Sequence, residues 1–176
     1  NLTFLASESG TSGGTATMQG LIPFIKVNAA GNVSSATVWT EPVFEALNEI
    51  WFRGGESDDR ILLTSRKAHG IANQWPSTLQ QTKSGQSTYG LKMSKYTGAH
   101  GDIRFVRTTS LEGDEYSKYA VGFDPGKVKL KYVRDTRMIK DRQGVSTDGY
   151  EEEVVTDLSA IWGHAETCCL WTDIAS

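Results

Sequence analysis

Residues 40–75 constrain the fold most strongly, because they read as a helix, a buried strand and a second helix in succession. Thr40 can cap the first helix and the glycines of 54–55 can end it. The run 61–63 (ILL) is the continuous apolar segment expected of a strand covered on both faces. Ser65 can cap the second helix. The first helix has one apolar stripe, made by Val43, Phe44, Leu47, Ile50 and Trp51. This region predicts a rigid α/β body.

The composition suits one substantial folded domain or two small ones. The chain has 176 residues, 38% of them hydrophobic, and its five Trp, six Tyr and six Phe supply enough large apolar surface for a core. A formal net charge of −3 gives no electrostatic argument for binding nucleic acid or an anionic membrane. The apolar runs are far shorter than the roughly 20 residues needed to cross a bilayer, so we expect no membrane partner. Because Asn1 is followed by no leader pattern, we expect a processed product or the ordered part of a longer chain.

Outside residues 40–75, the sequence predicts loops and short strands. Residues 18–27 (MQGLIPFIKV) are interrupted by Pro23 and predict a short extended piece, and residues 28–37 predict a small-residue loop. In residues 128–132 apolar side chains alternate with lysines, as in a strand with one polar face. Further strands are predicted over residues 91–96, 103–108, 119–123, 150–162 and 167–174. The expected fold class is therefore α+β.

Few residues suggest catalysis or metal binding. His69, His100 and His164 share no ligand spacing with each other or with the cysteines, so we expect no metal and no cofactor. Cys168 and Cys169 are adjacent and cannot build a disulfide framework; we interpret them as small buried side chains, with a reactive redox pair as the alternative. The chain has no nucleophile elbow, and we expect that it is not an enzyme. A small hydrolase with a site assembled from scattered residues stays open as an alternative function.

The strongest electrostatic feature is a separation of charge between two neighbouring segments. Residues 127–142 contain seven basic side chains against two acidic ones, and an acidic run begins at Glu151. If the segments pair as a hairpin, part of this pattern is ordinary complementarity across the strands. The other interpretation is that surfaces of opposite charge on successive subunits meet and fix the register of self-association. The candidate interface residues are Lys127, Lys129, Lys131, Arg134, Arg137, Glu151, Glu152 and Glu153.

Several segments, taken in order, resemble those of one known family. They are the apolar MQGLIPFI after a small-residue loop, the helix FEALNEIWFRGG, the strand-bearing RILLTSRKAHGIANQW, and then IRFVRTTSL, AVGFDPGKVKLKYVRD, IKDRQGVSTDG and EEEVVTDLSAIWGHAE. Their order is similar to that in the C-terminal portion of a tailed-bacteriophage major capsid protein of the SU-ten type, within the Hong Kong 97 fold. The likeness covers nearly the whole chain, although CCLW and the polar residues 76–90 have no counterpart in it.

The resemblance implies an α/β axial domain joined to β-rich peripheral strands, without the family's N-terminal arm, extended loop and spine helix. It implies a structural subunit that self-assembles into an icosahedral shell in the virion, after assembly in the host cytoplasm. The implied partners are other copies in pentamers and hexamers, other capsid or portal proteins, and enclosed DNA bound without sequence specificity. The implied divisions are 1–19 as the end of a peripheral segment and a linker, 20–115 as the axial domain, 116–164 as peripheral strands, and 165–176 as a strand returning to the axial domain.

A third candidate function is a β-rich phage tail or adhesion module. Such a module would present an exposed aromatic platform, for which Trp39, Trp75 and Trp171 are the candidates. The hydrolase would instead need a pocket that holds a histidine, a carboxylate and a nucleophile. A shell subunit needs neither feature, because its contacts are spread over many surfaces. The exposure of these tryptophans and the surroundings of the histidines therefore discriminate among the three functions.

Overall fold

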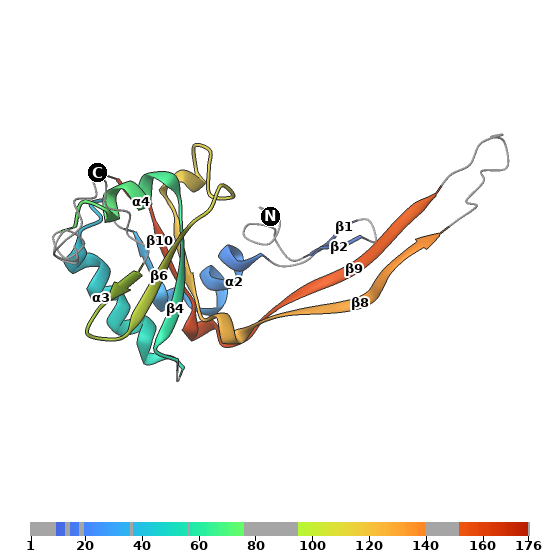
Figure 1. Cartoon of the computed structure of the whole chain (residues 1–176), viewed down its shortest axis with the longest axis horizontal. Coiled ribbons are helices and arrows are strands. Elements are labelled where there is room, and N and C mark those ends of the chain that lie inside the picture. Colours follow the sequence, from blue (N-terminus) through green and yellow to red (C-terminus); the bar gives the residue numbers. More distant parts are fainter. Residues whose placement is uncertain are drawn as a thin grey trace, which may run out of the picture.

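The computed structural model describes residues 10–12, 15–17, 20–35, 37–55, 57–75, 95–139 and 152–175, which form a body and a long two-stranded arm (Figure 1). The helices of this part are α2 (Leu21–Asn28), α3 (Glu41–Arg53) and α4 (Arg66–Ala72). Its strands are β1 (Gly10–Ser12), β2 (Thr15–Thr17), β3 (Val33–Ser35), β4 (Asp59–Thr64), β5 (Lys95–Thr97), β6 (Asp102–Arg107), β7 (Ala120–Phe123), β8 (Val128–Ile139), β9 (Glu153–Trp162) and β10 (Cys169–Thr172). Single 3-10 turns are η1 (Ala30–Asn32), η2 (Tyr116–Lys118), η3 (Pro125–Lys127) and η4 (Ala165–Thr167).

Helix α3 begins and ends where its sequence predicts. Thr40 is the N-cap residue, and Gly55 beyond the helix has a φ of +89°, which glycine adopts without steric strain. The expected apolar stripe was too wide, because Val43 and Ile50 lie on the solvent side and are 37% and 38% exposed. The buried residues of the helix are Phe44, Leu47, Asn48 and Trp51. The helix therefore meets the sheet along a narrow line of large side chains.

Strand β4 and helix α4 confirm the second part of the predicted unit. Leu62 is fully buried in the cluster under α3 and α4, while Leu63 packs against the cluster on the other face of the sheet. Ser65 accepts a hydrogen bond on its hydroxyl oxygen from the amide of Ala68 at 3.1 Å, as an N-cap does. The strand is thus covered on both faces, as its apolar run predicted.

The described strands of the body form one mixed sheet in the order β3-β10-β7-β4-β6-β5. Strand β4 is parallel to β6, and β10 is parallel to β3, whereas the other neighbours are antiparallel. Strand β7 lies between β10 and β4 in this sheet, although it follows the sequence-based division at residue 116, and that division stays a prediction. Strand β7 fits at the centre of the sheet because it carries a glycine where the ring of Trp51 lies against it. A Cβ at Gly122 would lie 2.7 Å from that ring.

Two segments near the start of the body differ from expectation. Residues 21–28 form helix α2 rather than an extended piece, because Pro23 falls in the first turn, where a helix needs no amide donor. Residues 28–37 are not only a loop, since β3 joins the edge of the sheet. The parallel partner that fixes β3 is β10, which lies far away in the sequence and cannot be recognised from the local pattern.

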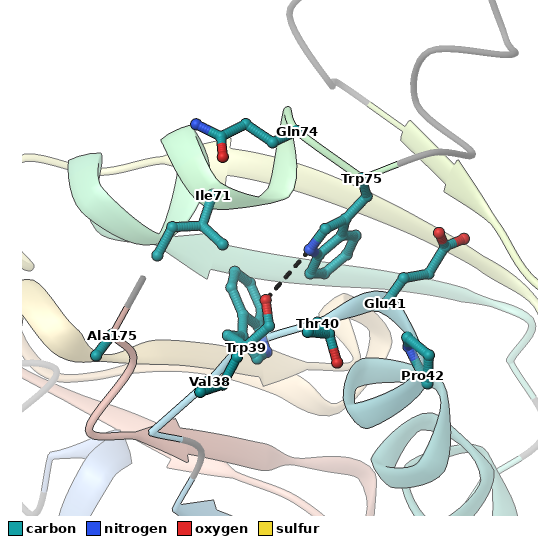
Figure 2. Close-up of a pocket in the computed structure, with 9 residues that line it drawn as sticks. All are labelled: Val38, Trp39, Thr40, Glu41, Pro42, Ile71, Gln74, Trp75 and Ala175. Carbon is teal, nitrogen blue, oxygen red and sulfur yellow. Dashed lines mark hydrogen bonds between the residues drawn. The ribbon is translucent and has the colours of Figure 1, made fainter.

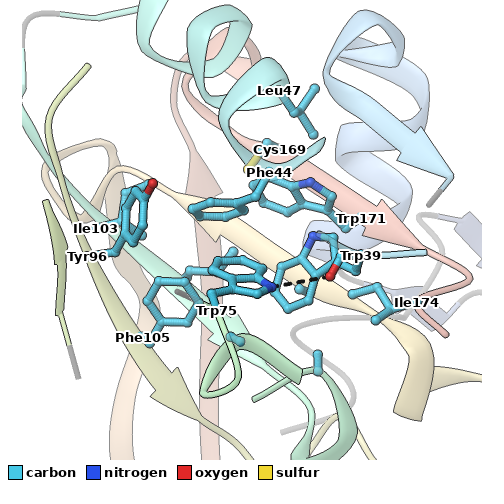
Figure 3. Close-up of a cluster of buried hydrophobic side chains, with 14 of the residues drawn as sticks. Trp39, Phe44, Leu47, Trp75, Tyr96, Ile103, Phe105, Cys169, Trp171 and Ile174 are labelled. Atoms are coloured by element: carbon cyan, nitrogen blue, oxygen red, sulfur yellow. Dashed lines mark hydrogen bonds between the residues drawn. The ribbon is translucent and has the colours of Figure 1, made fainter. Parts of the chain in front are cut away.

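The main core lies between the sheet and helices α3 and α4, and Figure 3 shows the side chains that fill it. Phe44 is at its centre: the ring of Trp39 lies 5.8 Å from it, and four closer partners lie at centroid distances from 4.9 to 5.7 Å. Those partners are Trp75, Tyr96, Phe105 and Trp171. A second cluster lies under α2 and includes Leu21, Ile25, Leu111 and Leu170. Burial of large aromatic rings on one face of the sheet stabilises the body from which the arm projects.

Candidate assembly surface

The arm is a ribbon of β8 and β9 that extends well beyond the body (Figure 1). Residues opposite each other in an antiparallel ladder point to the same face, so the register defines two faces. The apolar face carries the pairs Val128–Trp162, Leu130–Ala160, Tyr132–Leu158 and, beyond two register shifts, Met138–Val154. The basic face carries the pairs Lys129–Ile161 and Lys131–Ser159. The alternating apolar residues of β8 and β9 therefore share one face of the ribbon, and the lysines of β8 lie on the other face.

The apolar face of the arm is open to solvent in the isolated chain. Leu130 is 57% exposed, Tyr132 58% and Val154 64%. A two-stranded ribbon alone is at best marginally stable in water, and a contiguous exposed apolar surface usually marks a site of interaction. We therefore take the arm as the candidate functional site of the chain.

The register also tests how the charges of the arm are arranged. Lys129 and Lys131 lie opposite neutral residues, and neither forms an ion pair with another described side chain. The backbone register places Arg134 opposite Asp157 and the two lysines opposite uncharged residues. The use of these charges at a subunit interface stays a prediction.

The remaining candidate charges are scattered. Lys127 lies in η3 at the root of the arm, and Arg137 is exposed opposite Val155 in the register. Glu152 is exposed beside β9, and the backbone of Glu153 pairs with Ile139 near the far end. Glu151 lies outside the described residues. The structure thus brings the lysines of β8 together on one face and places the described acidic residues near the far end of the ribbon.

A set of buried donors fixes the root of the arm to the body. After β9, the chain passes through η4, and its backbone carbonyls accept hydrogen bonds from three side chains. Asn32 donates to the carbonyl oxygens of residues 166 and 168, each at 2.9 Å. Trp51 donates to the carbonyl of Thr167 at 2.7 Å, and Arg60 donates to the same oxygen at 3.1 Å. Because three consecutive carbonyls are held, the exit of the arm is firmly positioned.

Arg60 is the residue that sequence analysis missed. It is fully buried in β4, donates also to the carbonyls of Ser57 and Gly54, and stacks over the rings of Trp51 and Phe52. Burial lowers the pKa of Arg60, and the carboxylate of Asp124 is the main influence that opposes this change. The available signal was its position two residues before Leu62, on the buried side of an alternating strand.

Asp124 stands at the other side of the root, just before β8. One carboxylate oxygen accepts from the amide of Gly126 at 2.8 Å, and the side chain is only 2% exposed. A buried cation in β4 and a buried anion before β8 therefore flank the point where the arm leaves the body.

The largest described hollow lies at the opposite end of the body and is apolar (Figure 2). Its walls include Val38, Ile71 and Pro42, and the Trp75 indole donates to the carbonyl of Trp39 at 3.3 Å. Trp39 and Trp75 are 1% and 4% exposed and Trp171 is fully buried, so none of the three provides an exposed aromatic platform. These three tryptophans therefore cannot form the exposed binding platform that an adhesion module would need.

The described residues also offer little to a hydrolase. His69 is buried with its ring nitrogen 3.2 Å from the Thr64 hydroxyl, and none of the three histidines lines any of the five hollows found. Both cysteines are buried free thiols, and burial raises the pKa of Cys168 to about 11. No group of three or more metal-binding side chains occurs within the described ranges. No helix among them is long and apolar enough to span a bilayer.

Comparison with known proteins identifies the family. A family model described as SU10 major capsid protein matches residues 1–175. The chain belongs to this family. The resemblance to this capsid family that was predicted from the sequence is thereby confirmed. No curated protein matches the chain significantly in sequence.

One solved structure shows the same fold. A chain of the satellite phage P4 procapsid, solved with the size determination (Sid) protein, superposes with a TM-score of 0.56 at 11% identity, covering 98% of this chain and 56% of that one. A chain of the cyanophage P-SCSP1u capsid gives a TM-score of 0.49 at 12% identity, with 77% and 46% covered. The predicted Hong Kong 97-type fold, a body with a long β arm, is confirmed by the first of these. The chain spans about half the length of the capsid chains that it matches.

Proposed function

We propose that copies of this chain, as part of the complete subunit, tile a closed icosahedral shell around a DNA genome. In this proposal the copies group into pentamers and hexamers, assembly takes place in the host cytoplasm, and portal or other capsid proteins join the same shell. The DNA is enclosed without sequence recognition, and the chain itself catalyses no reaction. Membership in the capsid family supports the proposal.

The observation that carries the proposal is the arm with its solvent-exposed apolar face. Leu130, Tyr132 and Val154 lie on one side of a ribbon that the body does not cover. We propose that another capsid polypeptide segment covers this face in the assembled shell. The opposite, basic face is then the one left for neighbouring copies.

The fold suggests how the subunit is divided. We propose the body, with α2, α3, α4 and the mixed sheet, as the axial domain around the symmetry axes. The arm of β8 and β9 is the peripheral domain that reaches towards neighbours. The fixed root at Arg60 and η4 sets the angle between the two parts, and this angle contributes to the curvature of the shell.

The proposal is tested by producing the complete gene product and examining it by electron microscopy and analytical ultracentrifugation. We expect closed isometric particles. Changing Leu130 and Tyr132 to Gln should prevent particle formation, whereas changing exposed Val27 and Val106 on the body to Thr should not. Circular dichroism of all variants shows whether the body still folds. A complete product that remains a monomer under all assembly conditions, or an arm variant that forms normal shells, would contradict the proposal.

A further inference from the structure

The basic face of the arm and one flank of helix α3 are complementary in charge and spacing. Lys129 and Lys131 on the arm are two residues apart on a strand, a step of about 6.6 Å, and Lys127 precedes them by the same number of residues. On α3, Glu41, Glu45 and Glu49 are four residues apart, a step of about 6 Å along the helix axis. The steps of the two rows nearly agree: the arm's row consists of the two lysines of β8, with Lys127 just before it in η3, and the helix row holds three glutamates.

The flank of α3 that carries the three glutamates has one described cation, Arg53, which follows Glu49 by four residues in the last turn. Like charges at four-residue spacing disfavour a helix, so the row needs a compensating partner. Tyr96 donates to the carboxylates of Glu45 and Glu41, which orients these groups without neutralising them. Neither carboxylate, nor that of Glu49, forms an ion pair with any described side chain.

The other acidic surfaces of the described body already have basic neighbours. Asp59 pairs with Arg104, and Asp102 pairs with Lys95. The acidic turn at Glu112 borders the same hollow as two basic side chains of α4, Arg66 and Lys67. The α3 row is therefore the acidic surface that best fits an external cationic partner.

Apolar side chains beside the two rows strengthen the match. Ile161 lies opposite Lys129 on the basic face of the arm and is 45% exposed. Ile50 and Val43 on the solvent side of α3 are also exposed. A contact between the two surfaces would bury these apolar side chains together with the ion pairs. Binding of nucleic acid by the lysines alone would leave the apolar side chains exposed.

The two rows cannot meet within one subunit. The C-terminal end of helix α3 contacts η4 at the root of the arm, and from this root the arm extends away from the body and the helix (Figure 1). A contact between them must join two copies, and it uses different surfaces on each. Such head-to-tail contacts close into rings when the rotation between copies allows it.

We propose that the lysine row of one arm docks on the glutamate row of α3 in a second copy. This proposal rests on the proposed function in shell assembly and specifies one of its interfaces. Each exposed ion pair contributes little, but the contact repeats around a ring, so the sum is large and depends on salt.

The test is a charge swap in the complete capsid subunit. Lys129→Glu with Lys131→Glu reverses the arm, and Glu41→Lys with Glu49→Lys reverses the helix while Glu45 keeps its bond to Tyr96. Each pair of changes alone should raise the protein concentration needed for assembly at least about tenfold, since several repeated contacts are lost. All four changes together should restore assembly. Lys67→Glu with Lys118→Glu changes the net charge as the arm variant does and should assemble like wild type.

The outcomes separate this interface from the proposed function. If the combined variant stays defective, or if the arm variant assembles normally, the pairing is wrong while shell assembly stands. If the arm variant forms shells that only lose packaged DNA, the lysines contact nucleic acid and the pairing is also wrong. If the wild-type subunit forms no shells at all, both the interface and the proposed function fail. Thermal unfolding of each unassembled variant shows that the fold is intact.

Discussion

Replacing Arg60 with Met tests whether a single buried cation holds the root of the arm. Arg60 donates to the carbonyls of Ser57, Gly54 and Thr167, and among the described side chains a second donor, Trp51, reaches only the last of these. Met fills a similar volume and stacks on the same rings, but it donates no hydrogen bond. The substitution therefore removes hydrogen bonds and charge with little loss of packing.

The expected cost follows from these contacts. The buried carbonyl of Gly54 loses its donor at about 1–3 kcal/mol, the half-buried carbonyl of Ser57 loses one at a smaller cost, and Asp124 loses its nearby cation. Removing one member of a buried charged set usually costs about 3–5 kcal/mol, because the other charge stays buried. We expect Arg60→Met to lower the free energy of unfolding by about 3–5 kcal/mol. For a chain of this size the Tm should fall by roughly 6–20 °C.

The assay is thermal and urea unfolding of unassembled subunits, followed by circular dichroism. Asp124→Asn keeps the acceptor for the Gly126 amide but removes the charge, so the double variant should recover about 0.5–3 kcal/mol relative to the sum of the single variants. Arg104→Met, on the exposed side of β6, is the matched control and should change stability little. If Arg60→Met unfolds like wild type, or if the two single variants are additive, then Arg60 does not hold the root in the way described.

Three further predictions concern the body. Phe44→Ala should lower the free energy of unfolding by about 3–5 kcal/mol, because it empties the centre of the aromatic cluster, and a loss below 1 kcal/mol in urea melts would show that the cluster is not cooperative. Gly122→Ala should destabilise the chain by more than about 1 kcal/mol, because the new methyl group meets Trp51 and Cys169. Gly70→Ala, in a helix with open space around this position, should instead raise the Tm. Equal effects of the two substitutions on stability would contradict this packing. Burial raises the pKa of Cys168 to about 11. The unfolded chain therefore releases this proton near pH 9 while the folded chain retains it, so stability should fall as pH rises from about 9 to 11. In Cys168→Ala this part of the decline should be absent, and an unchanged pH profile in that variant would count against the burial of the thiol.

The sequence predicted the elements whose signals are local. Thr40 and Ser65 marked helix starts, and the alternation of Val128 to Tyr132 marked the ribbon and its faces. The helix around Pro23 was missed, because the position of a proline within a first turn depends on where the helix begins. The place of β7 in the sheet was not predicted, since membership of a sheet depends on distant partners, and the division at residue 116 stays a prediction.

The candidate site was predictable only in part. The charges of β8 and β9 were visible in the sequence, but their sharing of a face depended on the register and on two bulges. The root of the arm was not predictable, because Asn32, Trp51 and Arg60 come from separate elements and act on carbonyls more than 100 residues away. Charged residues inside an apolar strand, as at Arg60, are the one local sign of such a structural role.

A reconstruction of the assembled particle by electron cryomicroscopy tests the central claim most directly. We predict a closed shell in which each body lies towards a symmetry axis and each arm contacts another copy of the chain. A complete subunit that never forms shells, or a shell whose arms touch no neighbouring copy, would contradict the account.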